Sequence, residues 1–252
     1  MGSEMCIRDR AIIDQMVRIT LAEGKGQSSD ASDAAPENCS LEQQVTNQQA
    51  QTRIQKKNRD TIRAAALEVF ATHGYRGATL DQIAAEAGLS KPNVLYYFAN
   101  KEAIYAELLS GLLETWLDPL RAIDPDGEPI AEIIAYVQRK LQMSRAYPRE
   151  SRLFANEIVQ GAPRILDQIE GPLRALVDDT ADMLRHWMEV GRLAPLDPHH
   201  LIFSIWATTQ HYADFNVQIR GILQPDDDEH LDTATVFLTE MFTRALTPSG
   251  KH

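Results

Sequence analysis

From Arg53 almost to its C-terminus, this chain of 252 residues carries apolar residues at intervals of three and four positions, and this periodicity constrains its fold most. Such spacing places side chains on one face of an α-helix. No segment shows the strict alternation, or the runs of Val, Ile and Thr, that are typical of a β-strand. The sequence therefore predicts an all-α protein.

Local signals predict three helices between residues 51 and 101. A first, longer helix should end at Gly74, because glycine adopts the left-handed conformation that closes a helix. Thr79 and Gln82 have the spacing of a capping box and mark the start of a second helix, and Ser90 can cap a third. Two short helices after a longer one form the helix-turn-helix pattern, in which the last helix enters a major groove of DNA.

The predicted third helix, residues 90–98, carries side chains that suit DNA. Val94 and Phe98 are four positions apart and can pack inward, which leaves the polar residues exposed. Lysine and asparagine at its N-terminal end can reach base edges, and tyrosine hydroxyls suit phosphate oxygens. Each residue alone fits a core aromatic or a helix cap better, but together they favour DNA. The candidate DNA-binding residues are Thr79, Ser90, Lys91, Asn93, Tyr96, Tyr97 and Lys101.

The distribution of charge is compatible with that assignment. The whole chain has a formal charge of −11 at pH 7, which by itself argues against binding a polyanion. Residues 51–101 nevertheless have a surplus of four positive charges, which leaves −15 for the rest of the chain. A solvated basic helix would give the same surplus, so charge alone does not decide.

Residues 1–50 are expected to be a disordered or non-native tail. The stretch 24–50 is rich in Ser, Asp, Gln and Asn and has little to bury, and residues 4–10 resemble translated sequencing-adapter sequence. Both cysteines lie in this tail, so no disulfide is expected in the helical part. No apolar run approaches the ~20 residues that span a bilayer, so we expect no membrane anchor and a cytoplasmic location.

Residues 102–252 are predicted to form a helical domain for effector binding and dimerisation. Asn100 should cap a long helix that passes Trp116 and that Pro119 limits or bends. The last two large helices carry enough apolar residues for a four-helix interface between two subunits. Further helices are expected at Pro129–Tyr147, Arg149–Gln160, Pro172–Val190, Pro198–Ile219 and His230–Leu246. The expected dimer-interface residues are Leu201, Ile205, Val236, Phe237, Met241 and Phe242.

Three stretches, Phe70–Thr79, Gln82–Lys91 and Tyr96–Glu102, combine into a specific pattern. A glycine ends the first helix, a threonine begins the second, and a tyrosine-rich third helix is followed by a lysine. In these features the chain resembles the TetR/AcrR family of transcriptional regulators. The resemblance implies a homodimer that binds double-stranded operator DNA, with two recognition helices that read half-sites about one DNA turn apart.

The likeness extends over most of residues 57–223. Trp116–Leu120, Ser151–Phe154, Gly161–Pro163 and Leu201–Tyr212 resemble the pyrimidine-utilisation (rut operon) repressor subgroup of that family. Members of the subgroup sense uracil or thymine. The resemblance therefore implies a repressor whose effector is a pyrimidine or a similar small planar molecule.

A planar effector needs flat apolar side chains and a few polar groups around it. An indole, as in Trp116 or Trp206, can cover a flat ring, and the carboxamide of Gln210 can both donate to and accept from an imide edge. Such residues inside a helical bundle are more often core filler than a ligand site. The candidate effector-binding residues are Trp116, Phe154, Trp206, Thr209 and Gln210.

Other classes of function find less support in the sequence. It contains no Gly-rich phosphate loop, no His-Glu-x-x-His and no nucleophile elbow, so we expect no enzyme, no catalytic residue and no cofactor. The adjacent His199 and His200 point in different directions on a helix, so no metal site is expected. Two alternatives stay open: a TetR-type regulator of an unrelated effector such as a drug or metabolite, and a helical interaction protein without DNA binding.

Overall fold

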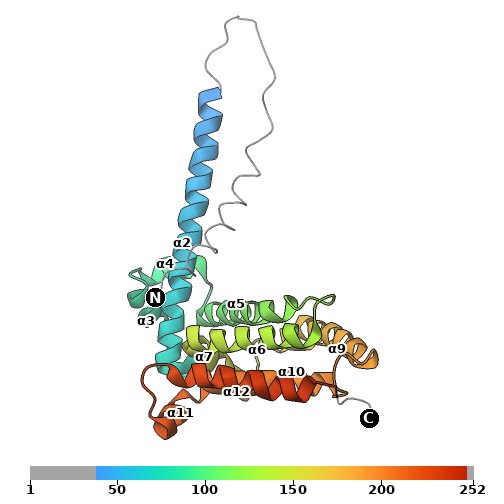
Figure 1. The fold of residues 1–252 in the computed structure, drawn as a ribbon. Helices are drawn as coiled ribbons and strands as arrows, with labels where there is room; N and C mark the ends of the chain where they lie inside the picture. Colours follow the sequence, from blue (N-terminus) through green and yellow to red (C-terminus); the bar gives the residue numbers. More distant parts are fainter. Residues whose placement is uncertain (1–37, 249–252) are drawn as a thin grey trace, which may run out of the picture. The chain divides into compact units, whose positions relative to one another are not determined.

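The computed structural model describes residues 38–248, and the side chains of residues 53–248. Within that range all regular secondary structure is helical, so the predicted all-α class is confirmed. None of the described helices combines the length and the apolar character needed to cross a membrane. The helices in Figure 1 are α2 (Asn38–Gly77), α3 (Leu80–Glu86), α4 (Lys91–Tyr97), α5 (Lys101–Arg121), α6 (Pro129–Ala146), α7 (Pro148–Val159), α8 (Leu166–Gln168), the π-helix η1 (Ile169–Leu173), α9 (Arg174–Glu189), α10 (Pro198–Asp214), α11 (Asn216–Leu223) and α12 (Glu229–Leu246).

Helix α2 begins earlier than the composition suggested. It starts at Asn38, inside the stretch 1–50 that was expected to lack structure. Residues 38–50 contain no Pro or Gly, and their Gln, Glu, Ala and Leu side chains favour helix, which explains the difference. The expected tail before residue 38 lies outside the described residues.

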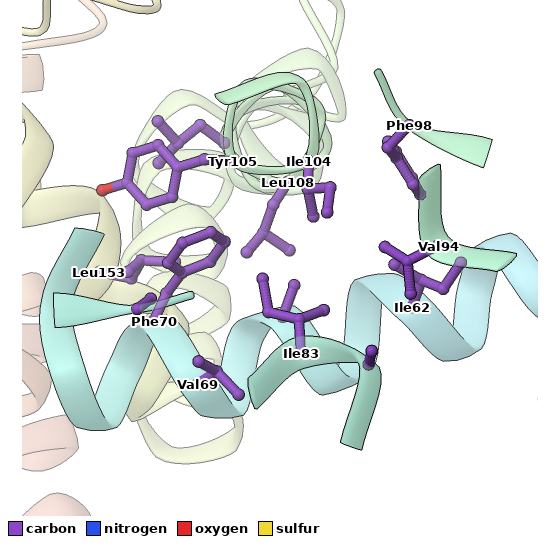
Figure 2. Close-up of a cluster of buried hydrophobic side chains, with 14 of the residues drawn as sticks. Ile62, Val69, Phe70, Ile83, Val94, Phe98, Ile104, Tyr105, Leu108 and Leu153 are labelled. Atoms are coloured by element: carbon purple, nitrogen blue, oxygen red, sulfur yellow. The ribbon is translucent and has the colours of Figure 1, made fainter. Parts of the chain in front are cut away.

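Helices α2 to α5 pack around one apolar core, drawn in Figure 2. Ile62 and Phe70 of α2 face Ile83 of α3, and all three are almost fully buried. Leu153 of α7 and Tyr105 of α5 close the same core. The helix-turn-helix segment therefore shares its core with α7, a helix from the predicted effector domain.

Helix α6 is the centre of a second core. It packs against α10 and α12, and Figure 1 shows α5, α6 and α10 running side by side. Tyr136 and Val137 of α6 are buried with Trp187 of α9, Ile202 of α10 and Phe242 of α12. This core holds α10 in a fixed rotation, which decides which of its residues face a ligand.

Two helix boundaries in this part differ from the predictions. The expected helix Pro198–Ile219 is broken at Phe215, which separates α10 from α11. No Gly or Pro marks the break, so the sequence carried no local signal for it. The expected helix Pro172–Val190 is preceded by the wider turns of η1, and its regular α-helical part starts at Arg174.

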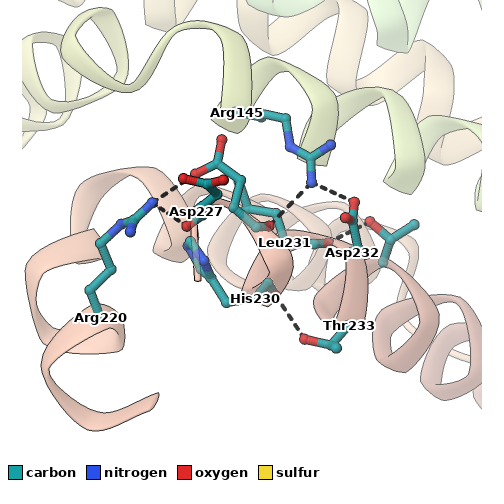
Figure 3. Close-up of polar contacts among 9 residues, drawn as sticks. Arg145, Arg220, Asp227, His230, Leu231, Asp232 and Thr233 are labelled. Carbon is teal, nitrogen blue, oxygen red and sulfur yellow. Dashed lines mark hydrogen bonds and ion pairs between the residues drawn. The ribbon is translucent and has the colours of Figure 1, made fainter. Parts of the chain in front are cut away.

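Polar contacts fasten α11 to the start of α12, as Figure 3 shows. Arg220 of α11 donates to the carbonyl of Asp227 at 2.6 Å and to the carboxylate of Asp228 at 2.8 Å. Arg145 of α6 pairs with Asp232 of α12 and donates to the carbonyl of Asp228 at 3.3 Å. These contacts join α6, α11 and the start of α12.

Candidate DNA-binding surface and effector cavity

Helices α3 and α4 begin at the caps that the sequence predicted. The Thr79 hydroxyl accepts a hydrogen bond from the backbone N–H of Gln82 at 3.2 Å, and the Gln82 side chain accepts one from the backbone N–H of Thr79 at 2.8 Å. Gly88 turns the chain with a φ of +64°, and Ser90 Oγ accepts from the backbone N–H of Asn93 at 3.4 Å. Both hydroxyl groups therefore serve as helix caps.

Helix α4 buries one face and exposes the other. Val94 and Phe98 are buried, as their spacing predicted. Asn93 is exposed at the N-terminal end of the helix, and Tyr96 is 71% exposed. An exposed tyrosine offers both a ring and a hydroxyl to a partner. The exposed face of α4 therefore presents residues suited to DNA.

The two candidate lysines are placed differently. Lys91 is exposed, and its Nζ lies 2.9 Å from the carboxylate of Asp81 on α3, a weak surface pair that a phosphate or a base can replace. Lys101 Nζ donates to the backbone carbonyls of Tyr75 at 2.7 Å and Ala78 at 2.8 Å. Two of the three N–H groups of Lys101 are thus used to join α5 to the end of α2, which leaves one for a phosphate.

Two residues of α2 that the sequence analysis did not single out hold the end of α4. Asn58 Nδ2 donates to the Tyr97 hydroxyl at 2.9 Å, which leaves that hydroxyl's own proton for another acceptor. The Arg59 guanidinium lies 4.5 Å from the centre of the Phe98 ring and pairs with Glu107 of α5. The hydrogen bond from Arg59 lowers the pKa of Glu107. No local signal reveals these contacts, because the partners are far apart in the sequence.

A hollow of about 400 Å³ lies beside the exposed face of α4. It combines two cationic side chains with two tyrosine hydroxyls, which are donors suited to phosphate oxygens. Its lining residues are Gln55, Lys56, Arg59, Tyr96 and Tyr97.

A cavity of about 360 Å³ lies between α5, α7 and the end of α10, and we call it the effector cavity. Three of the five candidate effector residues line it: Trp116, Phe154 and Gln210. The rings of Trp116 and Phe154 are 5.7 Å apart between centroids, with 30° between their planes. The complete lining is Trp116, Ser151, Arg152, Phe154, Ala155, Asn156, Ile158, Val159, Gln210, Asp214 and Phe215.

The other two candidates, Trp206 and Thr209, do not line this cavity. The indole N–H of Trp206 donates to the hydroxyl of Tyr136 on α6 at 2.6 Å. Thr209 is fully buried, and its hydroxyl donates to the backbone carbonyl of Ile205 at 2.7 Å. Trp206 lies one helical turn before Gln210, where its indole contacts α6, and Thr209 lies about 100° around α10 from Gln210, where Ser144 of α6 donates to its backbone carbonyl.

Polar groups that the sequence analysis did not name lie at the α10 side of the cavity. Ser151 Oγ donates to Asp214 Oδ1 at 2.5 Å. Burial raises the pKa of Asp214, while the Ser151 hydrogen bond and the positive charges of Arg152, His211 and Lys140 oppose that change. Lys140 on α6 is only 2% exposed, and burial lowers its pKa to about 7 against the opposing effect of Asp214.

Trp116 also borders a second hollow of about 360 Å³. Its other lining residues come from α2, α5, α6 and α7, and they include Asp60, Arg63 and Glu150. Trp116 therefore stands between the effector cavity and a wall formed partly by the first helix of the helix-turn-helix segment.

Helix α7, which forms much of the cavity wall, also reaches the helix-turn-helix segment. Its buried Glu157 pairs with Arg164 at 3.1 Å. The Arg164 guanidinium stacks over the Tyr75 ring at 3.8 Å, near the end of α2. Burial and the negative charge of Glu157 raise the pKa of Tyr105 on α5 to about 12. We call Glu157, Arg164 and Tyr75 the α7 clamp.

Two family models match the chain. The model described as bacterial regulatory proteins, tetR family, matches residues 62–108. The model described as YcdC-like protein, C-terminal region, matches residues 109–249, which is more than half of the chain. The chain belongs to the TetR family. This TetR protein is therefore a DNA-binding transcriptional regulator and not an enzyme.

A curated relative narrows the position of this TetR protein within the family. The HTH-type transcriptional regulator RutR of Escherichia coli (strain K12) is 46% identical over 171 residues, which cover 68% of this chain and 81% of the relative. This similarity supports the assignment to the rut repressor subgroup. The HTH-type transcriptional regulator SrpR of Pseudomonas putida is more distant, at 32% identity over 48% of this chain and 62% of the relative.

Solved structures agree with the TetR fold. The putative transcriptional regulator SCO4942 from Streptomyces coelicolor superposes with a TM-score of 0.62 at 26% identity, over 76% of this chain and 99% of that one. The ketosteroid transcriptional regulator KstR2 of Mycobacterium tuberculosis gives a TM-score of 0.61 at 22% identity, over 76% and 95%. The latter similarity concerns the fold alone.

TetR-family regulators act as dimers, and the structure separates the residues expected at the interface into two groups. Leu201, Ile205 and Phe242 are buried within the monomer, so they belong to the core around α6 and their expected place at the interface was wrong. Val236 and Phe237 on α12 are exposed. Met241 is partly buried, and Phe203 on α10 is exposed although it was not predicted.

Within residues 53–248 no group of three or more His, Cys, Asp and Glu side chains is arranged to hold a metal ion. His199 lies 2.9 Å from the carboxylate of Asp178 on α9. His199 is half-exposed and contacts this carboxylate, and His200 is exposed.

Proposed function

We propose that this TetR regulator is a repressor that a pyrimidine, uracil or thymine, or a similar small planar molecule, releases from its operator. The observation that carries the proposal is the effector cavity, where the rings of Trp116 and Phe154 and the carboxamide of Gln210 meet. Flat apolar walls with a few polar groups suit a planar ring with an imide edge. The resemblance of residues 57–223 to the pyrimidine-utilisation repressors points to the same class of ligand.

We propose that two segments of the chain have separate functions. Residues 51–101 bind operator DNA through α4, with Lys91 and Asn93 toward bases and Tyr96, Tyr97 and Lys101 toward phosphates. Residues 102–252 bind the effector and form the homodimer. The exposure of α4 and the hollow beside it support this role for the first segment.

Helix α5 supplies a route between the two sites. It begins at Lys101, which contacts the end of α2, and it passes the cavity at Trp116. A change in its angle would alter the separation of the two recognition helices of a dimer, which must stay near one DNA turn. A coupling of ~1–3 kcal/mol would change DNA affinity ~5–150-fold.

The test is DNA binding by the purified full-length protein at fixed salt. A high-affinity duplex is first selected from a random-sequence pool, and its complex is then titrated with uracil, thymine and unrelated planar compounds. Release by the two pyrimidines alone is the expected result. Tight DNA binding that no pyrimidine affects would remove the proposed effector and favour an unrelated metabolite or drug.

A variant of the cavity makes the same test specific. Gln210→Leu should weaken uracil binding without changing DNA affinity in the absence of effector, because the side chain lines the effector cavity and not the hollow beside α4. Gln218→Leu on the exposed side of α11 is the matched control. Unchanged uracil affinity in Gln210→Leu would exclude that side chain from the site.

A further inference from the structure

The carboxylate of Asp214 stands out among the polar groups of the effector cavity. It is the last residue of α10, four positions after Gln210, so the two side chains lie on the same face of that helix. Both line the cavity. Asp214 was not among the residues that the sequence singled out as effector ligands.

One of its two oxygens is already satisfied and the other is not. Asp214 Oδ1 accepts the hydrogen bond from Ser151, a buried serine that holds the carboxylate in place. Oδ2 receives no hydrogen bond from residues 53–248. A ligand that covers this oxygen without offering it a donor leaves a carboxylate unsatisfied, which costs free energy. Oδ2 is thus an acceptor prepared for a donor that the ligand brings.

Two neighbouring side chains, Arg152 and Gln210, add further hydrogen-bonding groups to the cavity. Arg152 donates one N–H to the carbonyl of Ala213 at 3.4 Å and keeps its other donors. Gln210 can donate and accept. An acceptor, a donor and a carboxamide together match a ring that alternates N–H and C=O groups.

We propose that Asp214 determines the specificity of the effector cavity by accepting a ring N–H through Oδ2. The ligand class is a neutral ring that carries an N–H next to a carbonyl, with the carbonyl facing Gln210 or Arg152. Rings that bear only acceptors, or whose nitrogens are alkylated, are rejected because they leave Oδ2 buried without a donor. This inference rests on the proposed pyrimidine response and names the residue that reads the ligand.

The test combines a ligand series with one substitution, and it uses calorimetric titration of the full-length protein. The probes are uracil, 1-methyluracil, 3-methyluracil and 1,3-dimethyluracil. The wild-type protein should bind uracil ~10- to 150-fold more tightly than the dimethyl compound, the range expected for a hydrogen bond to a charged group. The weaker of the two monomethyl compounds identifies the N–H that meets Asp214.

Asp214→Asn separates a hydrogen bond from a steric effect. It keeps the shape of the side chain and removes its charge, so uracil affinity should fall while affinity for 1,3-dimethyluracil stays the same. A methyl group that merely collides with the cavity wall would weaken binding equally in both proteins. Asp179→Asn, at an exposed position on α9, makes the same charge change away from the cavity and should behave as wild type.

The outcomes are distinguishable. An unchanged ratio of the two affinities in Asp214→Asn overturns the role of Asp214 and leaves the pyrimidine response standing. If that variant has a lower melting temperature, the wild-type series alone decides: equal binding of uracil and its dimethyl form overturns the inference. A wild-type protein that binds neither uracil nor thymine overturns the proposed effector and this inference together.

Discussion

The candidate DNA contacts differ in what each side chain is free to do. Asn93 is exposed at the start of α4, where a carboxamide can pair with the edge of adenine. Lys56 lies on α2 and lines the hollow beside α4, where we expect its ammonium group to meet a phosphate. One side chain should therefore read sequence and the other should not.

We expect Asn93→Ala and Lys56→Ala to weaken DNA binding in two different ways. Asn93→Ala should cost ~1–3 kcal/mol on the selected duplex and relax specificity at one base pair. Lys56→Ala should weaken all duplexes about equally and reduce the slope of log affinity against log salt by ~1. Fluorescence anisotropy over a salt series on selected and scrambled duplexes measures both. The reverse pattern would place Asn93 on the backbone and Lys56 on a base.

Lys140 gives a prediction about pH. Its pKa is lowered by burial to about 7 in the folded protein, below its ordinary value of 10.5. Between these two values the unfolded chain binds more protons than the folded one, so this residue makes stability rise with pH from about 7 to 10.5. Lys140→Met should raise the melting temperature most at pH 7 or below, and the stability of the variant should rise less with pH between about 7 and 10.5. An equal increase in melting temperature at pH 7 and pH 10.5 would show that burial does not lower the pKa of Lys140.

For single residues, the sequence predicted the types of side chain in the effector cavity better than it predicted which positions line that cavity. Trp116, Phe154 and Gln210 meet in one cavity, but Trp206 and Thr209 face α6. All three α10 candidates are polar or aromatic residues within two turns, and Trp206 shares a face with Gln210, so only tertiary packing decides which of them meets α6 and which lines the cavity. Asp214 was missed because an acidic residue at a helix end normally indicates solvent.

At the scale of helices, the boundaries with local signals were predicted and those set by packing were not. Thr79, Ser90 and Asn100 each cap a helix with the side-chain hydrogen bond that their residue type favours. The break at Phe215 depends on how α10 and α11 pack, because the apolar periodicity continues through it. The bond between Asn58 and Tyr97 depends likewise on contacts between distant segments.

The α7 clamp gives the effector cavity a second mechanical connection to the helix-turn-helix segment, beside α5. One helix touches both sites: α7 lines the cavity, and Glu157 near its end holds Arg164 on Tyr75. A buried ion pair of this kind is costly to break, so the end of α7 and the end of α2 should move together.

Arg164→Lys tests this connection. Lysine keeps a positive charge for the buried Glu157 but loses the planar group that stacks on Tyr75. We expect DNA affinity without effector to change little and the release of DNA by effector to weaken by several fold. Arg185→Lys, which removes an exposed arginine paired with Asp182 on α9, is the control. Full release by effector in Arg164→Lys would leave α5 as the sole route.

For the whole molecule, α10 and α12 expose apolar residues that a second copy of the chain can cover. Phe203 is 45% exposed, Val236 61% and Phe237 60%. Large apolar side chains at this level of exposure on two helices favour a shared interface. Since TetR regulators form dimers, we expect the dimer to be the unit that binds the operator through two recognition helices.

Phe237→Glu should convert the dimer to a monomer at micromolar concentration and weaken operator binding at least tenfold. The substitution places a charge where an apolar surface would be buried against its copy, and a monomer loses the second half-site. Val190→Glu at the exposed end of α9 adds the same charge at a residue of similar exposure and should stay dimeric. Sedimentation velocity measures the oligomeric state of both variants. A Phe237→Glu variant that stays dimeric with a normal melting temperature would place the interface away from this face of α12. A folded monomer that still binds the full operator tightly would show that one helix-turn-helix segment is enough for operator binding.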